Sequence, residues 1–482
     1  MFAPVGHDRL DGVSIEHFAK ASIVRPLALL CLSLGVQSLA PTAQAAERAS
    51  EAPNVVIVFV DDQGYGDLSC YGSETVDTPR IDSLAADGMK FTSFYSAYCV
   101  CSASRAALLT GCYPPRISMP GVLGPNSRVG LHPDEVTIAD LLKQEGYATM
   151  CVGKWHVGDA PETLPTSQGF DRYLGLPYSN DMARAKGWGN GPNDLDTIWR
   201  TKKWDIYDND LLRNATSVES PVDQTTLTKR YTEEATAFIR ENRDRPFLLY
   251  MPHSMVHVPL FVTDDRWVED PAEAYRLAVE HVDWSVGEVL DTLDELNLAE
   301  DTLVVYTSDN GPWLSKRHHA GSAGPLRAGK GTTFEGGMRV PGLFRWPGVI
   351  PAGTVTDRVA GTVDLLPTIA EAAGADLPDR SLDGHSVLGM LKDPGTASPH
   401  DEHGLFYYKN GRVEALRMGQ WKLRFGRKNS GNPVLYDLDA DIAEANDVAG
   451  DHADVVERMT AFAKDYNDDL KANARPIWTR AR

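Results

Sequence analysis

Four apolar runs, each followed at once by polar residues, constrain the fold of this chain most strongly. They are "NVVIVFV" (54–60), "ATMCVG" (148–153), "PFLLYM" (246–251) and "TLVVYTS" (302–308). Near-continuous apolar runs of this length are typical of strands buried on both faces of a parallel sheet. Between the last two, residues 274–298 carry apolar side chains at helical spacing. The sequence therefore predicts an α/β fold, with a large, mainly parallel or mixed sheet sandwiched by helices.

The polar residues after these strands point to a functional site. In strand order they are Asp61-Asp62, Lys154-Trp155-His156, His253 with His257, and Asp309-Asn310. Ligands of open α/β sheets bind beyond the carboxyl ends of the strands. An acidic pair after one strand is usually a turn or a helix cap, but the coincidence at four strand ends favours a site.

The acidic pairs predict a hard-metal site. Asp61, Asp62, Asp309 and Asn310 offer only oxygen ligands, which suit Ca²⁺ first and Mg²⁺ second, whereas zinc prefers His or Cys. Because position 310 is Asn and not His, the set favours one hard cation over a zinc centre of phosphatase type.

Two cysteines one residue apart open the stretch "CVCSASRAALLTG" (99–111). From the residues alone, four interpretations stay open: a disulfide pair, a soft-metal site, a thiolate nucleophile, or packing. A lone C-x-C lacks the second half of a zinc site. If a leader carrying Cys31 is removed, five cysteines remain. An odd count in an oxidising compartment leaves one thiol that is buried, reactive or chemically altered.

The first 46 residues predict a signal peptide. Arg25 precedes an apolar run that ends in the small residues Ala43-Gln44-Ala45, the layout of a secretory leader. The run is too short to span a bilayer comfortably, so we expect an exported, periplasmic or secreted protein without stable membrane insertion. The formal net charge of −20 argues against nucleic acid as a partner. We predict a catalytic domain over 47–394 and a smaller C-terminal α+β domain with an antiparallel sheet over 395–482.

Several separate motifs then resemble one family. "CSASRAALLTG" looks like the sulfatase signature, Cys-x-Pro/Ala-Ser-Arg followed by a helix that ends in Thr-Gly. The other matching blocks, in the expected order, are "VDDQGYGDLSCYG", "GYATMCVGKWHVG", "LGLPYSNDM", "YTSDNGPW", "GKGTTFEGGMRVP", "ALRMGQWKLRF" and "VLYDLDADIAEANDVA". The resemblance covers about residues 52 to 450. It implies an alkaline phosphatase-like fold and hydrolysis of sulfate monoesters, either aryl sulfates or sulfated carbohydrates.

The resemblance also implies a modified residue. Cys101 is the signature position, because only it is in register with Ser104 and Arg105, and Cys99 lies outside the signature. A sulfatase-maturating enzyme would convert Cys101 into Cα-formylglycine, whose hydrated form attacks the sulfur of the ester. The modified residue would also join the metal ligands. The four remaining cysteines, an even number, would then pair or stay buried: Cys70, Cys99, Cys112 and Cys151.

The family pattern assigns roles to the other residues. Lys154 and Lys330 are the expected sulfate clamps, with Ser179 as a further sulfate contact. Arg105 would hold the diol, and His156 would orient it and accept its proton. His257 is the expected general acid on the leaving oxygen. For His253 the expected roles are packing or support of a neighbouring site residue, with contact to the substrate as the alternative.

Two departures from the family pattern stand out. Ala103 replaces the more common Pro, and Cys112 stands where a basic residue commonly follows Thr-Gly; the residues alone give no physical reason for the second change. Two other activities stay open, a phosphate or phosphonate monoester hydrolase of the same superfold and a catalytically inactive carbohydrate-binding relative.

Two further segments have two interpretations each. The stretch 180–226 carries Trp188, Trp199 and Trp204, which could stack on a substrate or anchor the loop itself. The basic stretch "KRHHAGSAGPLR" (316–327), with Arg317, His318 and His319, could contact a polyanionic polysaccharide or be a solvated loop.

Overall fold

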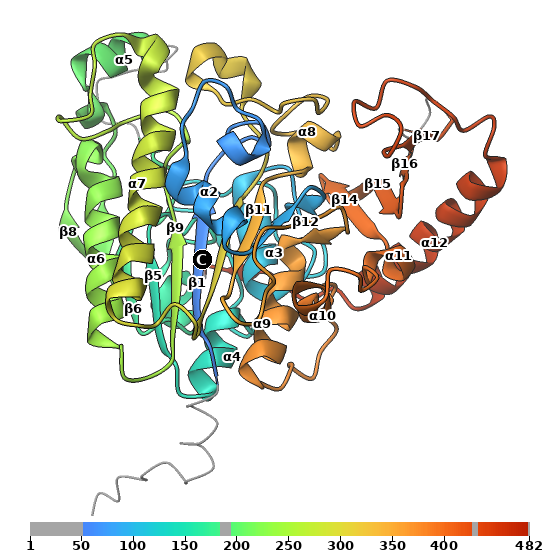
Figure 1. Cartoon of the computed structure of the whole chain (residues 1–482), viewed down its shortest axis with the longest axis horizontal. Coiled ribbons are helices and arrows are strands. Elements are labelled where there is room, and N and C mark those ends of the chain that lie inside the picture. The colour runs from blue at the N-terminus through green and yellow to red at the C-terminus, as the bar shows by residue number, and fades with distance from the viewer. Residues whose placement is uncertain (1–51, 184–193, 427–431, 481–482) are drawn as a thin grey trace, which may run out of the picture.

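A ten-stranded mixed sheet forms the centre of the molecule in the computed structural model, which describes residues 52–183, 194–426 and 432–480 (Figure 1). The strand order is β12-β2-β11-β10-β1-β9-β5-β6-β7-β8. The bounds are β1 (Asn54–Val60), β2 (Met89–Phe91), β5 (Ala148–Val152), β6 (Arg172–Gly175), β7 (Leu211–Arg213), β8 (Thr216–Glu219), β9 (Phe247–Pro252), β10 (Thr302–Ser308), β11 (Gly342–Arg345) and β12 (Thr354–Thr356). The central strands β10, β1, β9, β5 and β6 run parallel, and β11 and β7 join them antiparallel. The predicted strands and the mixed, mainly parallel sheet are confirmed.

Helices cover both faces of this sheet because the side chains of a strand alternate between its two faces. In β1, Val55, Ile57 and Phe59 pack with one apolar cluster, and the alternate residues pack with another. The first cluster includes α3 (Cys101–Thr110), α4 (Ile138–Gln144) and α9 (Leu365–Ala373). The second includes α2 (Pro79–Ala86), α6 (Leu227–Glu241) and α7 (Ala274–Glu295), the last of which is the helix predicted from the spacing at 274–298.

A separate antiparallel sheet follows near the C-terminus. It consists of β14 (Leu405–Lys409), β15 (Arg412–Met418), β16 (Trp421–Arg424) and β17 (Val434–Asp437), with the long helix α12 (Ala453–Ala472) against it. Short helices α10 (Leu388–Lys392) and α11 (His400–His403) lead into this sheet. Its apolar residues, such as Tyr407 and Leu416, belong to the same cluster as α3 and α9. The two sheets therefore share one apolar core, and the boundary at residue 395 stays a prediction.

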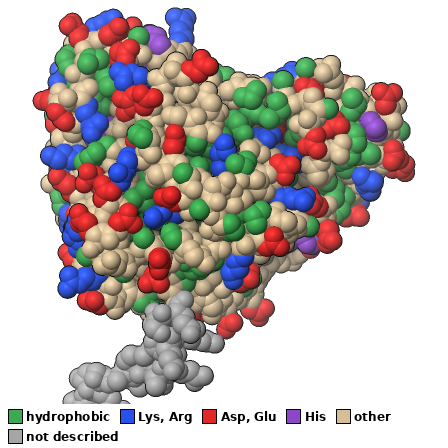
Figure 2. Space-filling view, viewed as in Figure 1, with side chains coloured by type: hydrophobic (Ala, Val, Ile, Leu, Met, Phe, Trp, Pro, Cys, Tyr) green, Lys and Arg blue, Asp and Glu red, His purple; other side chains and the backbone are tan. Residues whose placement is uncertain are grey.

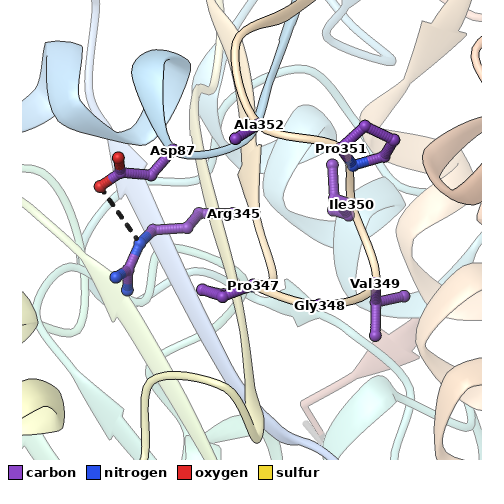
Figure 3. A pocket seen from close by; sticks show the side chains of 8 residues that line it. All are labelled: Asp87, Arg345, Pro347, Gly348, Val349, Ile350, Pro351 and Ala352. Carbon is purple, nitrogen blue, oxygen red and sulfur yellow. Dashed lines mark ion pairs between the residues drawn. The ribbon is translucent and has the colours of Figure 1, made fainter.

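The end of the sheet at which β11 finishes carries a shallow pocket of about 610 Å³ (Figure 3). Arg345, the last residue of β11, pairs with Val304 near the start of β10 and lies 3.8 Å from the Asp87 carboxylate. The loop 347–352 forms the other wall. Because β10 and β11 are antiparallel, this pocket lies at the amino end of β10, at the opposite edge of the sheet from Asp309.

The surface on the side shown in Figure 2 carries acidic and basic side chains interspersed, so the net negative charge does not gather there in one patch. Across the three described ranges, no helix combines the length and apolar character needed to cross a membrane. The predicted signal peptide, 1–46, lies outside the described residues.

Candidate active site

The carboxyl ends of four parallel strands bring the predicted residues to one edge of the sheet. Register pairs Val60 with Ser308 across β1 and β10, which places Asp61 beside Asp309. The backbone N–H of Lys154 donates to Pro252 O at 2.7 Å, joining the end of β5 to the end of β9. The fold therefore brings together residues that lie up to about 250 positions apart in the sequence. They meet at the carboxyl edge of the sheet, where open α/β sheets bind their ligands.

Buried ion pairs form the inner wall of the site. The Arg105 guanidinium donates to Asp309 Oδ2 from Nη2 at 2.8 Å and from Nε at 3.1 Å, and to Lys154 O from Nη1 at 2.8 Å. The Lys154 ammonium bonds to Asp61 and lies 3.2 Å from Ser179 Oγ. All of these side chains are fully buried or nearly so. Burial would raise the pKa of Asp61, but the surrounding cations, Lys154 first, hold that pKa well below its ordinary value.

Cys101 begins helix α3 directly beside this cluster. Its Sγ lies 3.6 Å from Asp61 Oδ1, and Val100 in extended conformation precedes the helix without a side-chain cap. The first N–H groups of a helix carry partial positive charge and favour a bound anion. Burial raises the pKa of the Cys101 thiol far above its ordinary value. An unmodified thiol at this position is therefore held protonated and is a poor nucleophile.

The two ring nitrogens of His156 differ, because one is hydrogen-bonded and the other is buried without a partner. Its Nε2–H donates a hydrogen bond to Leu123 O at 2.8 Å, whereas the buried Nδ1 has no hydrogen-bond partner. Its backbone has a positive φ of 63°, a conformation that non-glycine residues seldom adopt. Burial, reinforced by Lys154 and Arg105, holds the pKa of His156 well below its ordinary value. His156 is therefore a neutral imidazole with a free acceptor at Nδ1.

The outer part of the site is made by His257, Lys330 and Trp313. Lys330 Nζ lies 2.6 Å from Asp62 Oδ1, and its side chain is 10% exposed. His257 Nε2 lies 3.6 Å from Asp62 Oδ2. The Trp313 indole lies against both, with its centroid 5.4 Å from that of the His257 ring and 4.6 Å from Lys330 Nζ. Exposure rises from none at Lys154 to 10% at Lys330, so solvent approaches the cluster from the side of Lys330 and His257.

Asn180 orients the His257 ring. His257 Nδ1 lies 2.7 Å from Val258 O and 3.2 Å from Asn180 Oδ1, and the Asn180 amide donates to Pro259 O at 3.0 Å. Since Nδ1 faces acceptors, it carries a proton, and Nε2 is the nitrogen directed toward Asp62. Burial and then Lys330 lower the pKa of His257.

His253 and Cys99 lie near the site without joining it. His253 is buried, with Nε2 3.5 Å from Ser285 Oγ of α7, and burial lowers its pKa to about 4. Cys99 is buried, and burial raises its pKa to about 11; its carbonyl accepts the Gly331 N–H at 2.8 Å. The backbone of Cys99, not its thiol, thus supports the segment that carries Lys330.

All five cysteines of the described ranges are free: Cys70, Cys99, Cys101, Cys112 and Cys151. For the four cysteines other than Cys101, the sequence left open whether they form disulfides or stay buried, and the structure shows them unpaired. Cys70 is half-buried, and the other four are buried.

The donor set fits a divalent cation. Ligand atoms of Asp61, Asp62, Cys101 and His257 all lie within 4.8 Å of one another. The Asn310 amide donates to Asp62 Oδ1 at 2.8 Å, while the buried Asn310 Oδ1 has no partner. Burial, followed by the nearby Asp61 carboxylate, raises the pKa of Asp309 to about 7, so the ionised form of Asp309 is disfavoured here and a cation beside it would favour that form. Asp309 lies outside the tight group and binds Arg105 and the Asp62 N–H.

Two contributors to the site, Asn180 and Trp313, were not singled out in the sequence. Both stand inside motifs quoted above, "LGLPYSNDM" and "YTSDNGPW". Their closeness in sequence to Ser179 and Asn310 is the signal that could have identified them. In the 180–226 segment, Trp199 is buried and donates to Val268 O at 2.8 Å, which supports the anchoring interpretation for that residue. Trp188 lies outside the described residues.

The fold and site define a class, the enzymes that act on anionic esters at the edge of a large mixed sheet covered by helices. The family description "Sulfatase" matches residues 53–375, and "N-sulphoglucosamine sulphohydrolase, C-terminal" matches residues 329–468. The chain is 38% identical to human arylsulfatase A over 428 residues, 83% of each chain. The chain belongs to the sulfatase family and is a sulfatase enzyme.

Solved structures agree with this assignment. Ps i-CgsB in complex with k-i-k-neocarrahexaose is 31% identical, with a TM-score of 0.75 over 88% of this chain and 94% of that one. The PsFucS1 sulfatase from Pseudoalteromonas sp. is 26% identical, with a TM-score of 0.76 over 90% and 95%. The fold prediction is confirmed by these similarities together with the two sheets.

Proposed function

We propose that this sulfatase hydrolyses sulfate monoesters of aryl alcohols or carbohydrates through a formylglycine formed from Cys101, with a Ca²⁺ ion bound beside it. The position of Cys101 carries the proposal, since the residue heads helix α3 next to Asp61 and is surrounded by buried cations. Once formed, the hydrated aldehyde supplies the hydroxyl group that attacks sulfur. The remaining steps are assigned to side chains of this chain.

Charge balance supports the cation. Asp61, Asp62 and Asp309 face Arg105, Lys154 and Lys330, so the cluster of three carboxylates and three cations is neutral as it stands. A sulfate ester adds one negative charge, which a neutral buried cluster disfavours. Ca²⁺ held by Asp61, Asp62, Asp309, Asn310 and the modified Cys101 would supply the missing positive charge and polarise the sulfate.

Lys154, Lys330 and Ser179 then bind the sulfate. Ca²⁺ on Asp61 and Asp62 would share these carboxylates with the two ammonium groups, so that both ammonium groups would also be able to bind the substrate. Burial would lower the pKa of Lys330, but Asp62 and the neighbouring acidic groups raise it above its ordinary value, so this cation stays charged. Lys154 Nζ lies 3.2 Å from Ser179 Oγ, which supports the proposal that both groups contact the same sulfate.

Two histidines move the protons. The free Nδ1 of neutral His156 can accept a proton from the nucleophile's hydroxyl group when sulfate is released. His257 has Nδ1 held by Val258 O and Asn180, so its other ring nitrogen, Nε2, faces the site. When Nε2 is protonated as well, the resulting imidazolium can donate that proton to the leaving oxygen, and the neutral Nδ1–H imidazole remains. Arg105 orients the inner wall through Asp309 and the Lys154 carbonyl.

The cellular setting belongs to the same proposal. The predicted leader would export the chain to the periplasm or the medium, and a maturating enzyme would act on Cys101 before folding, because Cys101 is buried in the folded protein. Measuring the release of sulfate from a panel of sulfated polysaccharide fragments and aryl sulfates would identify the natural ester.

One experiment tests the activity. Protein produced with a maturating enzyme is assayed on the sulfate, phosphate and phosphonate monoesters of one phenol, with Cys101→Ala as the inactive control and Cys99→Ser as the matched control. We expect preference for sulfate, an aldehyde at position 101 by peptide mass spectrometry, and loss of turnover in Cys101→Ala alone. Preference for phosphate or phosphonate would establish the rival hydrolase. Binding of sulfated sugars without turnover in the aldehyde-bearing protein would establish the inactive relative.

A further inference from the structure

A second group of metal-ligating side chains lies outside the catalytic cluster, in the turn η7 (Leu314–His319) and helix α5 (Leu195–Thr201). His318 Nε2 and His319 Nε2 each lie 2.8 Å from the same atom, Asp196 Oδ1. The two imidazole centroids are 4.5 Å apart. Three potential ligand atoms therefore converge from two segments separated by more than 100 residues.

The backbone is kinked directly before the two histidines. Arg317 has φ 57° and ψ −123°, a conformation that non-glycine residues seldom adopt. Side chains of consecutive residues in an extended chain point to opposite sides, and in a helix they diverge by about 100°. The consecutive residues His318 and His319 nevertheless direct both Nε2 atoms to one atom, Asp196 Oδ1.

We propose that Asp196, His318 and His319 form a binding site for a first-row transition-metal ion, with Zn²⁺ as the preferred ion. Two imidazoles and one carboxylate suit zinc, whereas Ca²⁺ prefers oxygen ligands alone. Tetrahedral zinc with ligands at about 2.0 Å separates neighbouring ligand atoms by about 3.3 Å. The observed 2.8 Å separations need to widen by only about half an ångström, within the reach of side-chain rotation.

The burial of the three residues suits an ion with open positions. The His319 side chain is 4% exposed, while those of His318 and Asp196 are 42% and 36% exposed, so one side of the group faces protein and the other faces solvent. Water would complete the coordination on the exposed side.

Such an ion would join the turn η7, which lies beside the entrance of the catalytic site, to helix α5. The turn starts next to Trp313, which lies against His257 and Lys330. The stretch 316–327 is thus not simply a solvated loop, since its two histidines are tied to Asp196. The site stands independently of the catalytic proposal, because none of its three ligands belongs to that cluster.

Zinc stoichiometry tests the site without any activity assay. Chelated protein is saturated with Ca²⁺ to fill the hard site, titrated with Zn²⁺ by calorimetry, and analysed for metal after gel filtration. We expect wild type to retain about one zinc per chain more than His318→Ala/His319→Ala or Asp196→Asn. His132→Ala, which removes a half-buried histidine 3.6 Å from Asp134, is the matched control and should match wild type.

Cobalt gives a second readout, because Co²⁺ absorbs visible light according to its ligands; the band should appear in wild type and disappear in Asp196→Asn. If the double variant does not fold, His318→Ala, which alters a 42% exposed side chain, and Asp196→Asn carry the comparison. Equal zinc content in wild type and in these variants, whether one ion or none, would overturn the proposal.

Discussion

The assignment of His257 as general acid makes a prediction that depends on the leaving group. His257→Ala should slow substrates with poor leaving groups, such as alkyl or sugar sulfates, by about 10²–10⁴-fold, the usual contribution of a positioned acid. Aryl sulfates of acidic phenols need little protonation and should lose much less. The structure separates these two effects because, among the described residues, the ion-pair contact of the His257 ring is with Asp62.

That contact sets the loss common to all substrates. His257 Nε2 lies 3.6 Å from Asp62 Oδ2, beyond a normal hydrogen bond, and Asp62 keeps Lys330 at 2.6 Å when His257 is removed. The uniform loss should therefore stay near 1 kcal/mol, or about fivefold to tenfold. A plot of log kcat/KM against leaving-group pKa should be steeper for His257→Ala than for wild type.

His253 provides the control. It is a buried histidine four residues away, packed on Ser285 and Tyr231 away from Asp62, so His253→Gln should shift all substrates equally. Parallel plots for wild type and His257→Ala would refute the acid role. Asn180→Ala, which removes one acceptor from His257 Nδ1, should change the slope in the same direction by a smaller amount.

Further predictions concern the metal, the ion pairs and the cysteines. Removing the cation with a chelator should abolish turnover, and Ca²⁺ should restore it better than Mg²⁺, with Zn²⁺ ineffective; a requirement for zinc would contradict the oxygen-ligand set. Arg105→Met leaves the Asp309 carboxylate buried and unpaired, so urea unfolding should show a loss of about 3–5 kcal/mol, with Arg105→Lys intermediate; an unchanged midpoint would count against this. Cys99→Ser should keep the aldehyde and most activity, checked by peptide mass spectrometry, and loss of the aldehyde would show that Cys99 takes part in maturation. His400 faces Asp364 at 2.8 Å and a carbonyl oxygen at 2.9 Å; burial lowers its pKa, but Asp364 outweighs this and raises it. The pair stabilises the fold fully below about pH 6.5 and loses this effect as the pH rises through the higher folded-state pKa of His400. The melting temperature of wild type should therefore exceed that of His400→Asn by less and less between pH 6 and pH 9. A difference that stays constant over this range would contradict the prediction.

The central strands were predictable because a doubly buried parallel strand carries its signal in its own residues. Each of the four predicted strands matches the structure to within about one residue. The outer strands were not predictable in the same way. β7 and β11 are three and four residues long, and they join the sheet antiparallel through contacts that no local pattern encodes.

The site shows the same division between local and distant information. Strand ends predicted where Asp61, Lys154 and Asp309 would meet, because parallel strands align their carboxyl ends. The partners of those residues depend on loops. Asn180 reaches His257, and Trp313 reaches both His257 and Lys330, through loop paths that are set by tertiary packing and not by sequence spacing.

Cys112 illustrates how a distant segment can account for an unexpected residue. The neighbouring residues do not explain a small thiol where the family commonly has a basic side chain after Thr-Gly. In the structure, a guanidinium does lie there, but it belongs to Arg475, whose Nη2 is 3.1 Å from Cys112 Sγ. The same guanidinium forms two short bonds to the buried Glu135 carboxylate, from Nε at 2.8 Å and from Nη2 at 2.9 Å. An arginine at position 112 would compete with Arg475 for this space and charge, so the C-terminal segment and the loss of the local basic residue fit together as one arrangement.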